Sequence, residues 1–151
     1  MIIFLDSGPL ALLTNSKTPP QTLAILTWAS AMHQAGHRFI VPAIADYEVR
    51  RELERSGKTA SLKVLDSWNN ADPQRLIPLT DSALKLAAKL WAQARNVGKP
   101  TADPKELDGD VLIAAQVLDM GFPLSEIVIA TVNVSHISLF APADEWQNVK
   151  P

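Results

Sequence analysis

Four polar residues stand where an α/β protein usually builds a site, because each follows or opens an apolar segment. They are Asp6 after the apolar opening run, Glu48 shortly after the run 39–41, Asp110 at the start of the helix-like run 110–118, and Asn133 after the run 127–131. Carboxylates at the ends of separate elements indicate a divalent-metal site. Such a site favours hydrolysis of a phosphodiester bond.

Oxygen ligands of this kind suit Mg²⁺ or Mn²⁺, and Mg²⁺ keeps several waters in octahedral geometry. Clustered carboxylates repel one another, which raises some of their pKa values until a cation binds. A bound ion lowers the pKa of a coordinated water and offsets negative charge in the transition state. The sequence holds no Ser-His-Asp arrangement, no His-x-x-x-His zinc motif and no Gly-rich phosphate loop that would support a competing chemistry.

The elements that must position these residues alternate between short buried strands and helices. Apolar runs without polar alternation predict strands at 2–5, 38–41, 75–79 and 127–131. Helical spacing, with caps before it and glycine after it, predicts helices at 19–36, 43–55, 59–70, 80–96 and 107–120. This order predicts an α/β fold with a parallel, twisted β-sheet flanked by helices on both faces. Such sheets bind ligands outside the carboxyl ends of their strands.

Some local details carry expectations of their own. Thr18 can cap the helix at 19–36. The inner face of that helix is expected to hold Leu23, Leu26, Ala29 or Ser30, and His33. Residues 99–106 are expected to form a polar loop, and the segment after 131 a short turn with an edge strand near Leu139.

The acidic residue after the first strand also has a purely structural interpretation. Asp6 can cap a short helix that starts at Pro9, a role that Ser7 could serve equally well. Burying an unpaired carboxylate is costly, so an Asp at a buried strand end needs a partner or a cation.

The acids on predicted helices have structural interpretations as well. Glu48 belongs to a charged helix face where neighbours can pair, but it lies in the first half of that helix, nearer the strand end. Asp46 either supports the metal ligands from behind or is a first-turn acid of the same helix. Asp108 is the expected cap of the helix at 107–120, which leaves Asp110 free for another task. Asp110 shares a helical face with Ile113, Ala114 and Val117.

The overall composition sets limits on the function. The sequence has no cysteine, which excludes disulfides, thiolate zinc sites and Cys nucleophiles and fits a reducing cytosol. No apolar stretch approaches the roughly 20 residues that span a bilayer, and the opening run is too short for a signal peptide. The formal net charge is −2, so any attraction to RNA would have to come from a local basic patch or from bound metal ions.

Four segments of the chain, taken in order, resemble PIN-domain ribonucleases and in particular the VapC-like toxins of bacterial toxin–antitoxin pairs. They are Leu5-Asp6-Ser7-Gly8-Pro9-Leu10, the helix with Glu48 and Glu52-Leu53, Asp110-Val-Leu-Ile-Ala-Ala115, and Thr131-Val-Asn-Val-Ser-His136. The resemblance runs from Met1 to about Trp146. It implies a single PIN-like nuclease domain over residues 1–146 and a C-terminal tail over residues 147–151.

The resemblance also implies an activity and its residues. The expected protein is a Mg²⁺- or Mn²⁺-dependent endoribonuclease that cleaves single-stranded RNA, with Asp6, Glu48 and Asp110 as metal ligands and catalytic residues. Asn133 falls where the family often has Asp and sometimes Asn, so one charge fewer is present there. Asp108 could compensate for a weaker second metal site. The implied partners are a small antitoxin and a second copy of the chain, in the cytoplasm and away from membranes.

Basic and aromatic side chains give further expectations. Three arginines on one predicted helix could contact RNA phosphates, unless some of them pair with Glu52 and Glu54: Arg50, Arg51 and Arg55. Three tryptophans with helical apolar neighbours are expected in the core or at an interface rather than as base-stacking platforms: Trp28, Trp68 and Trp91. A lone histidine such as His136 is more often structural than catalytic.

Two other functions compete with the nuclease. The net negative charge and Asn133 also fit a catalytically inactive PIN-like module that binds RNA or protein. A phosphatase of the haloacid dehalogenase type also begins with an Asp after its first strand. That family needs a second Asp two residues later, and here the position is Gly8.

Overall fold

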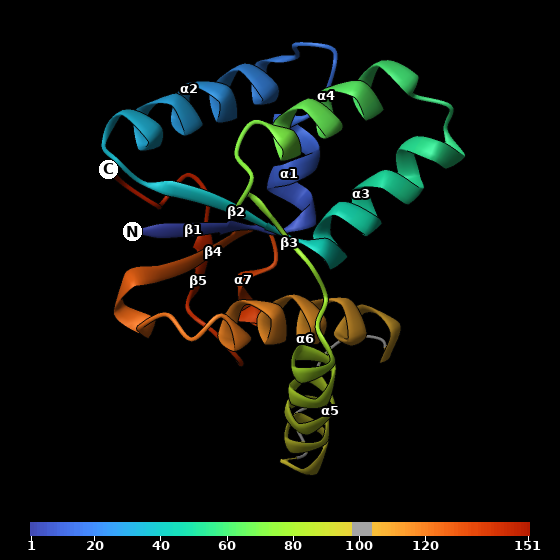
Figure 1. Ribbon diagram of the computed structural model, residues 1–151, viewed down its shortest axis with the longest axis vertical. Coiled ribbons are helices and arrows are strands. Elements are labelled where there is room, and N and C mark those ends of the chain that lie inside the picture. The colour runs from blue at the N-terminus through green and yellow to red at the C-terminus, as the bar shows by residue number, and fades with distance from the viewer. Residues whose placement is uncertain (98–103) are drawn as a thin grey trace.

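A parallel β-sheet separates two layers of helices in the computed structural model of the chain (Figure 1). The structure describes the backbone of residues 1–97 and 104–151, with the side chains of those residues outside 104–107. The elements of this part of the chain are β1 (Ile2–Leu5), α1 (Ser7–Leu13), α2 (Pro20–Gln34), β2 (Arg38–Pro42), α3 (Ala43–Arg55), α4 (Thr59–Asn70), β3 (Leu76–Ile77), α5 (Asp81–Asn96), α6 (Pro104–Asp119), a 3-10 turn (Leu124–Glu126), β4 (Ile127–Thr131), α7 (Val134–Ile137) and β5 (Ala143–Glu145).

Within the described residues the sheet has five strands in the order β3-β2-β1-β4-β5, and every neighbouring pair is parallel. The predicted α/β fold with a parallel sheet is confirmed. Leu5 of β1 is aligned with Ala130 of β4, so Asp6 and Thr131 leave the sheet side by side. The strand order reverses between β1 and β4, which is where open α/β sheets bind ligands.

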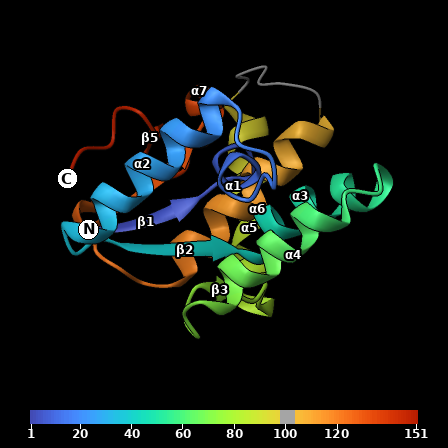
Figure 2. The same ribbon diagram turned by 90° about the horizontal axis from the view of Figure 1, so that it is seen from above.

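Helices cover both faces of the sheet. Helices α1 to α4 lie on one face and α6 and α7 on the other, with α5 packed against α6 (Figures 1 and 2). Edge-to-face aromatic rings, with centroids 5.5 to 5.8 Å apart, join the first layer to the sheet: Trp28, Phe39, Trp68 and Trp146. Trp28 and Trp68 therefore belong to the core, as expected, while Trp91 is 38% exposed. No helix among the described residues is long and apolar enough to cross a bilayer.

A buried glutamine on α6 connects three elements near the carboxyl ends of the strands. The side-chain oxygen of Gln116 accepts a hydrogen bond from the N–H of Ile44 in the first turn of α3, at 3.1 Å. Its side-chain nitrogen donates to the carbonyl of Ile77 at the end of β3, at 3.3 Å. Helix α3 follows Pro42 and has no side-chain cap. Gln116 thus satisfies an N–H group that the first helical turn leaves without a partner, and it holds α6 against α3.

The inner face predicted for α2 is largely wrong. The buried residues are Thr22, Ile25, Ala29 and Met32. Leu23 and Leu26 are 52% and 39% exposed, and Ala29 is the one residue predicted correctly. Because a polar Thr22 sits on the buried stripe and leucines sit on the exposed side, the sequence pattern points to the wrong side of the helix. The N-cap is Pro19, without a side-chain hydrogen bond, so Thr18 does not cap this helix.

Several boundaries also differ from the prediction. Helix α7 was missed as an element because it is too short for a periodic pattern, and the short helix considered after Asp6 begins at Ser7 instead of Pro9. The strand expected at 75–79 covers only Leu76–Ile77, and the edge strand lies at Ala143–Glu145 instead of near Leu139. Helix α6 begins at Pro104, so Asp108 lies inside the helix and is not its cap. The remainder of the predicted polar loop, 99–103, lies outside the described residues.

The segment expected as a C-terminal tail packs on the domain. Val149 is 6% exposed, and its carbonyl accepts a hydrogen bond from the indole N–H of Trp28 at 2.9 Å. The folded unit therefore extends beyond Trp146.

The orientation of α2, which buries a different face from the predicted one, can be tested directly. Replacing Ile25, which is fully buried, by Ala should lower the free energy of unfolding by about 2–5 kcal/mol, because it leaves a cavity in the core. The matched Leu23→Ala variant on the exposed side should change it by less than about 0.5 kcal/mol. Urea denaturation of both variants measures the difference. Equal losses of unfolding free energy would contradict the burial of Ile25 and the exposure of Leu23.

Candidate active site

The four residues singled out in the sequence line one open cleft at the carboxyl ends of β1 and β4. The cleft has a volume of about 760 Å³. Asp6 comes from the end of β1, Glu48 from α3, Asp110 from α6, and Asn133 from the segment after β4. The structure therefore brings together residues that lie more than 120 positions apart in the sequence, at the point where the strand order reverses.

Asp6 is the most deeply placed of the three carboxylates. One oxygen accepts the N–H of Ser7 at 2.6 Å, which makes Asp6 the N-cap of α1. The other oxygen accepts the hydroxyl of Thr131 at 2.6 Å. The residue is 5% exposed. Burial raises the pKa of Asp6, and the hydrogen bonds from Thr131 and Ser7 only partly oppose that rise. The capping role and the placement in the cleft therefore coexist in one side chain.

Glu48 reaches the cleft from the second turn of α3 and is half-buried. Burial raises its pKa, and the negative charge of Asp6 raises it further. A hydrogen bond from Ser7 and the positive charge of Arg51 act in the opposite direction. Ser7 therefore interacts with both Glu48 and Asp6, and the charge of Asp6 acts on Glu48, although the two acids are on different elements.

Asp110 has a pKa raised to about 6. Burial is the largest cause, the charges of Asp6 and Glu48 add to it, and His136 partly offsets it. Its side chain is 13% exposed. The apolar residues that share its helical face are fully or almost fully buried, as the sequence predicts: Ile113, Ala114 and Val117. Three carboxylates with raised pKa values thus share one poorly solvated cleft.

Asn133 and His136 orient Asp110 from the other side of the cleft. The amide nitrogen of Asn133 lies 3.2 Å from Asp110 Oδ2 and 2.8 Å from His136 Nδ1. An amide nitrogen only donates, so Asn133 forms a hydrogen bond to His136 when Nδ1 carries no proton. The 3.3 Å approach of His136 Nδ1 to Asp110 becomes an ion pair only when the ring is protonated. Asn133 therefore supplies donors at a point where a carboxylate would have added another charge.

Asp46 and Arg50 do not line the cleft. Arg50 donates to both oxygens of Asp46 at 3.0 Å and to Asp66 on α4 at 2.8 Å. Asp46 also accepts from the side-chain amide of Asn69 at 2.7 Å. These contacts join α3 to α4, and they raise the pKa of Arg50. Asp46 is thus placed to bind α4 rather than to support the site, and Arg50 is committed to two carboxylates instead of facing a nucleic acid.

The other predicted residues are exposed on the surface. Asp108 is exposed and borders the cleft. Arg51 also lines the cleft, with its guanidinium carbon 5.4 Å from the centre of the Tyr47 ring. Arg55 is exposed and pairs with Glu52 at 2.9 Å. Of the three candidate arginines, Arg51 alone lines the cleft.

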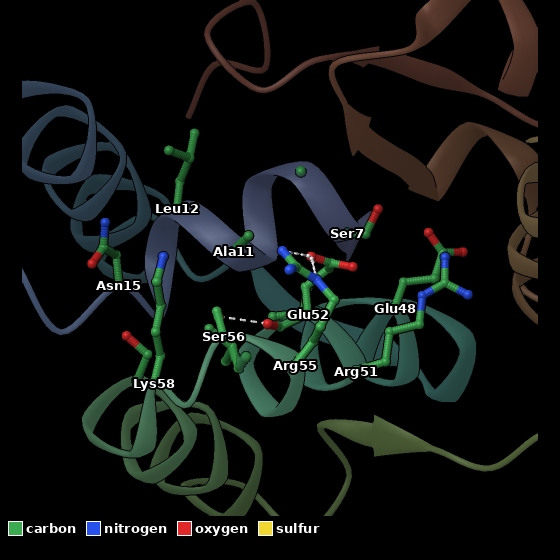
Figure 3. Close-up of a pocket in the computed structure, with 14 residues that line it drawn as sticks. Ser7, Ala11, Leu12, Asn15, Glu48, Arg51, Glu52, Arg55, Ser56 and Lys58 are labelled. Atoms are coloured by element: carbon green, nitrogen blue, oxygen red, sulfur yellow. Dashed lines mark hydrogen bonds and ion pairs between the residues drawn. The ribbon is translucent and has the colours of Figure 1, made fainter.

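A groove of about 560 Å³ runs from the cleft between α1, α3 and α4 (Figure 3). Ser7, Glu48 and Arg51 line both cavities, so the groove and the cleft are continuous. Arg51 marks one end of the groove and Lys58 the other (Figure 3). Apolar side chains form part of its lining: Ala11, Leu12, Val49 and Leu53. The groove thus combines an apolar lining with exposed cationic side chains along its edge.

The cleft fits a hydrated divalent cation better than a closed metal cage. Among the described residues, no three His, Asp or Glu side chains are close enough together to surround one ion. Mg²⁺, however, usually takes only one or two protein carboxylates and keeps its remaining waters. Asp6 lies deeply buried with only hydroxyl and amide donors hydrogen-bonded to it, and its neighbours in the cleft are two more acids. An oxygen-only, anionic donor set of this kind is suited to Mg²⁺ or Mn²⁺.

Sequence reasoning missed three residues that shape this site. Thr131 is fully buried and holds Asp6, and His136 contacts Asp110. Gly109 lies directly against the Glu48 carboxylate. The apolar run that ends at Thr131 was visible in the sequence, but its contact with Asp6 depends on the register between β1 and β4. The contacts of His136 and Gly109 likewise depend on how the helices are rotated.

Several solved structures are similar to this chain in fold. One is FitAB bound to an IR36 DNA fragment, with a TM-score of 0.72 and 15% identity, covering 99% of this chain and 98% of that chain. Another is FitAcB from Neisseria gonorrhoeae, with a TM-score of 0.68, 16% identity and coverage of 97% and 99%. A third is VapBC2 from Rickettsia felis bound to a promoter DNA fragment, with a TM-score of 0.69, 15% identity and coverage of 97% and 99%.

At these identities the likeness concerns the fold alone, and it confirms the PIN-type architecture that the sequence predicts. No protein-family model matches the sequence, and a search of curated proteins gives no significant match.

The raised pKa of Asp110 predicts how stability depends on pH without metal. Folding raises this pKa from 3.8 to about 6, so between those values the folded state binds more protons than the unfolded state. The free energy of unfolding therefore falls as the pH rises through this window. In EDTA, Asp110→Asn should melt above the wild type at pH 7.5, and its advantage should shrink toward pH 4.5.

Asp119 provides the matched control, because hydrogen bonds from Ser82 and Thr80 lower its pKa. Its contribution to stability is present at neutral pH and disappears as the pH falls through the lowered pKa. Asp119→Asn should therefore melt below the wild type at pH 7.5. Differential scanning calorimetry measures both variants, and an Asp110→Asn protein that melts below the wild type would contradict the repulsion inferred for the cleft.

Proposed function

We propose that this chain is a divalent-metal-dependent endoribonuclease that cleaves single-stranded RNA. The observation that carries the proposal is the convergence of Asp6, Glu48 and Asp110 from three elements into one poorly solvated cleft, where burial raises all three pKa values and neighbouring acids raise those of Glu48 and Asp110 further. Strongly perturbed acids in a cleft are typical of functional sites. One or two of these residues would ligate the ion directly, and waters bound to it would reach the others.

The ion, when bound, would neutralise the carboxylates, activate a water and offset charge on the phosphate. The chain's own residues would do the rest. Thr131 and Ser7 fix the orientation of Asp6, and Asn133 holds Asp110 through its amide N–H. Arg51 at the rim would contact a substrate phosphate. In the hydrolysis, a water oxygen forms a bond to phosphorus while the bond from phosphorus to the leaving sugar oxygen breaks.

Cleavage of a mixed single-stranded RNA by the purified protein tests this function. The wild type should cleave with Mn²⁺ or Mg²⁺ and not with EDTA. Asp110→Asn should lose at least about a hundredfold in rate, because it removes a charge on which cation binding depends. The matched control is Asp66→Asn, an exposed acid on α4, which should cleave like the wild type.

Cleavage that persists in Asp110→Asn would show that the site is assigned to the wrong residues. A wild-type protein that binds RNA without any metal-dependent cleavage would identify the chain as the non-catalytic binding module instead.

The proposed biological role is the toxin of a toxin–antitoxin pair. Its support is the likeness in fold to FitAB and VapBC2, over nearly the whole length of both chains. A small antitoxin would then be the partner of this chain. The same Asp110→Asn variant serves as the control in cells: expression of the wild type should arrest bacterial growth, and expression of the variant should not.

The groove beside the cleft would hold the RNA that flanks the scissile bond, because phosphates favour its cationic edge and bases favour its apolar lining. Arg51→Ala and Lys58→Ala should each weaken RNA binding. Each should also make the negative slope of log K against log salt less steep, by about 0.7 for every phosphate that the protein no longer neutralises. Fluorescence anisotropy in the Asp110→Asn background measures the slope without cleavage.

The control for the groove is Lys85→Ala, which removes an exposed cation from α5, outside the groove. It should leave the slope unchanged. Equal slopes for Arg51→Ala, Lys58→Ala and the parent protein would place the RNA elsewhere.

A further inference from the structure

Gly109 stands in the interior of α6, where glycine is unfavourable. In such a position it costs roughly 0.5–1 kcal/mol relative to alanine, because the unfolded chain loses more freedom. No unusual backbone angle requires it. Within the described residues, the glycines with positive φ are Gly36, Gly57 and Gly121, and Gly109 is not among them. The reason for glycine at this position therefore lies in space rather than in conformation.

The space that a side chain would fill at Gly109 is taken by Glu48. A Cβ atom at position 109 would lie 2.7 Å from Glu48 Oε1, 3.5 Å from its Cδ and 3.9 Å from Oε2. A separation of 2.7 Å is shorter than Cβ contacts allow, so the carboxylate would have to move. Gly36, Gly57 and Gly121 have no atom within 4 Å of the same point.

We propose that Gly109 is a positioning residue whose missing side chain lets the Glu48 carboxylate lie against α6, beside Asp110. This inference rests on the proposed metal-dependent function. Glu48 and Asp110 come from helices on opposite faces of the sheet, so their convergence requires a close approach of α3 to α6 (Figure 1). The glycine provides that approach at a cost in helix stability.

The contact involves the flexible end of a side chain, so the fold itself should tolerate alanine. Gly109→Ala should keep its fold and melt at or above the temperature of the wild type in EDTA, since alanine favours the helix. Its dissociation constant for Mn²⁺ should rise about 10- to 100-fold, as it does for residues that orient metal ligands. Electron paramagnetic resonance of free Mn²⁺ and calorimetry measure the two effects on the full chain.

Two further backgrounds show whether alanine acts through Glu48. In Glu48→Asp, the shorter side chain draws the carboxylate back from α6, so adding Gly109→Ala should weaken Mn²⁺ binding by less than twofold. In Glu48→Ala, no carboxylate is left to displace, and Gly109→Ala should again have almost no effect. A double-mutant cycle therefore gives a strong coupling between positions 48 and 109.

The outcomes separate the inference from the proposed function. If the wild type binds Mn²⁺ and Gly109→Ala binds it equally well, the positioning role is overturned and the metal site stands. If Gly109→Ala weakens binding by the same factor with and without Glu48, alanine acts elsewhere and the inference is also overturned. A wild type that binds no Mn²⁺ would overturn both.

Discussion

The repulsion among three carboxylates in one partly dry cleft is the constraint around which this structure is arranged. Asp6, Glu48 and Asp110 each lose hydration, and the charge of Asp6 makes the other two harder to ionise. Among the described residues, the groups around them are hydroxyl and amide donors, His136 beside Asp110, and Arg51 at the rim. Such an arrangement weakens the folded state, and the buried strands and helices on either side must offset that cost. Local rules of stability are broken in this way mainly where a protein carries out its function.

Much of this arrangement can be predicted from the sequence, because strands and helices follow from patterns of apolar residues that extend over many positions. The buried strands at 2–5 and 127–131 and the helices at 43–55 and 59–70 appear as predicted. A parallel sheet then places Asp6 and Asn133 at the same edge, whatever the details of packing. What could not be predicted depends on register and on helix rotation. The bond from Thr131 to Asp6 needs the β1–β4 register, and the pairing of Asp46 with Arg50 depends on where α4 docks. The buried face of α2 was misread because Thr22 interrupts its apolar stripe.

The likeness in fold to FitAB and VapBC2 at 15% identity shows how little sequence the architecture requires. Apolar residues of suitable size at the inward positions specify such a core, and many combinations satisfy it. The same tolerance means that a fold alone does not determine an activity. The functional argument therefore rests on a few side chains at the switch point and on their electrostatic environment. Asn133 illustrates this: one amide in place of a carboxylate removes a charge and adds two donors next to Asp110.

The glutamine that joins α6 to α3 and β3 has a mechanical consequence. Both polar ends of Gln116 are buried and hydrogen-bonded, so prying the two helices apart would leave donors and acceptors unsatisfied, at about 1–3 kcal/mol each. Gln116 therefore resists separation of α3 from α6, the helices that carry Glu48 and Asp110. The spacing of these two acids is thus tied to a pair of buried hydrogen bonds that neither acid makes.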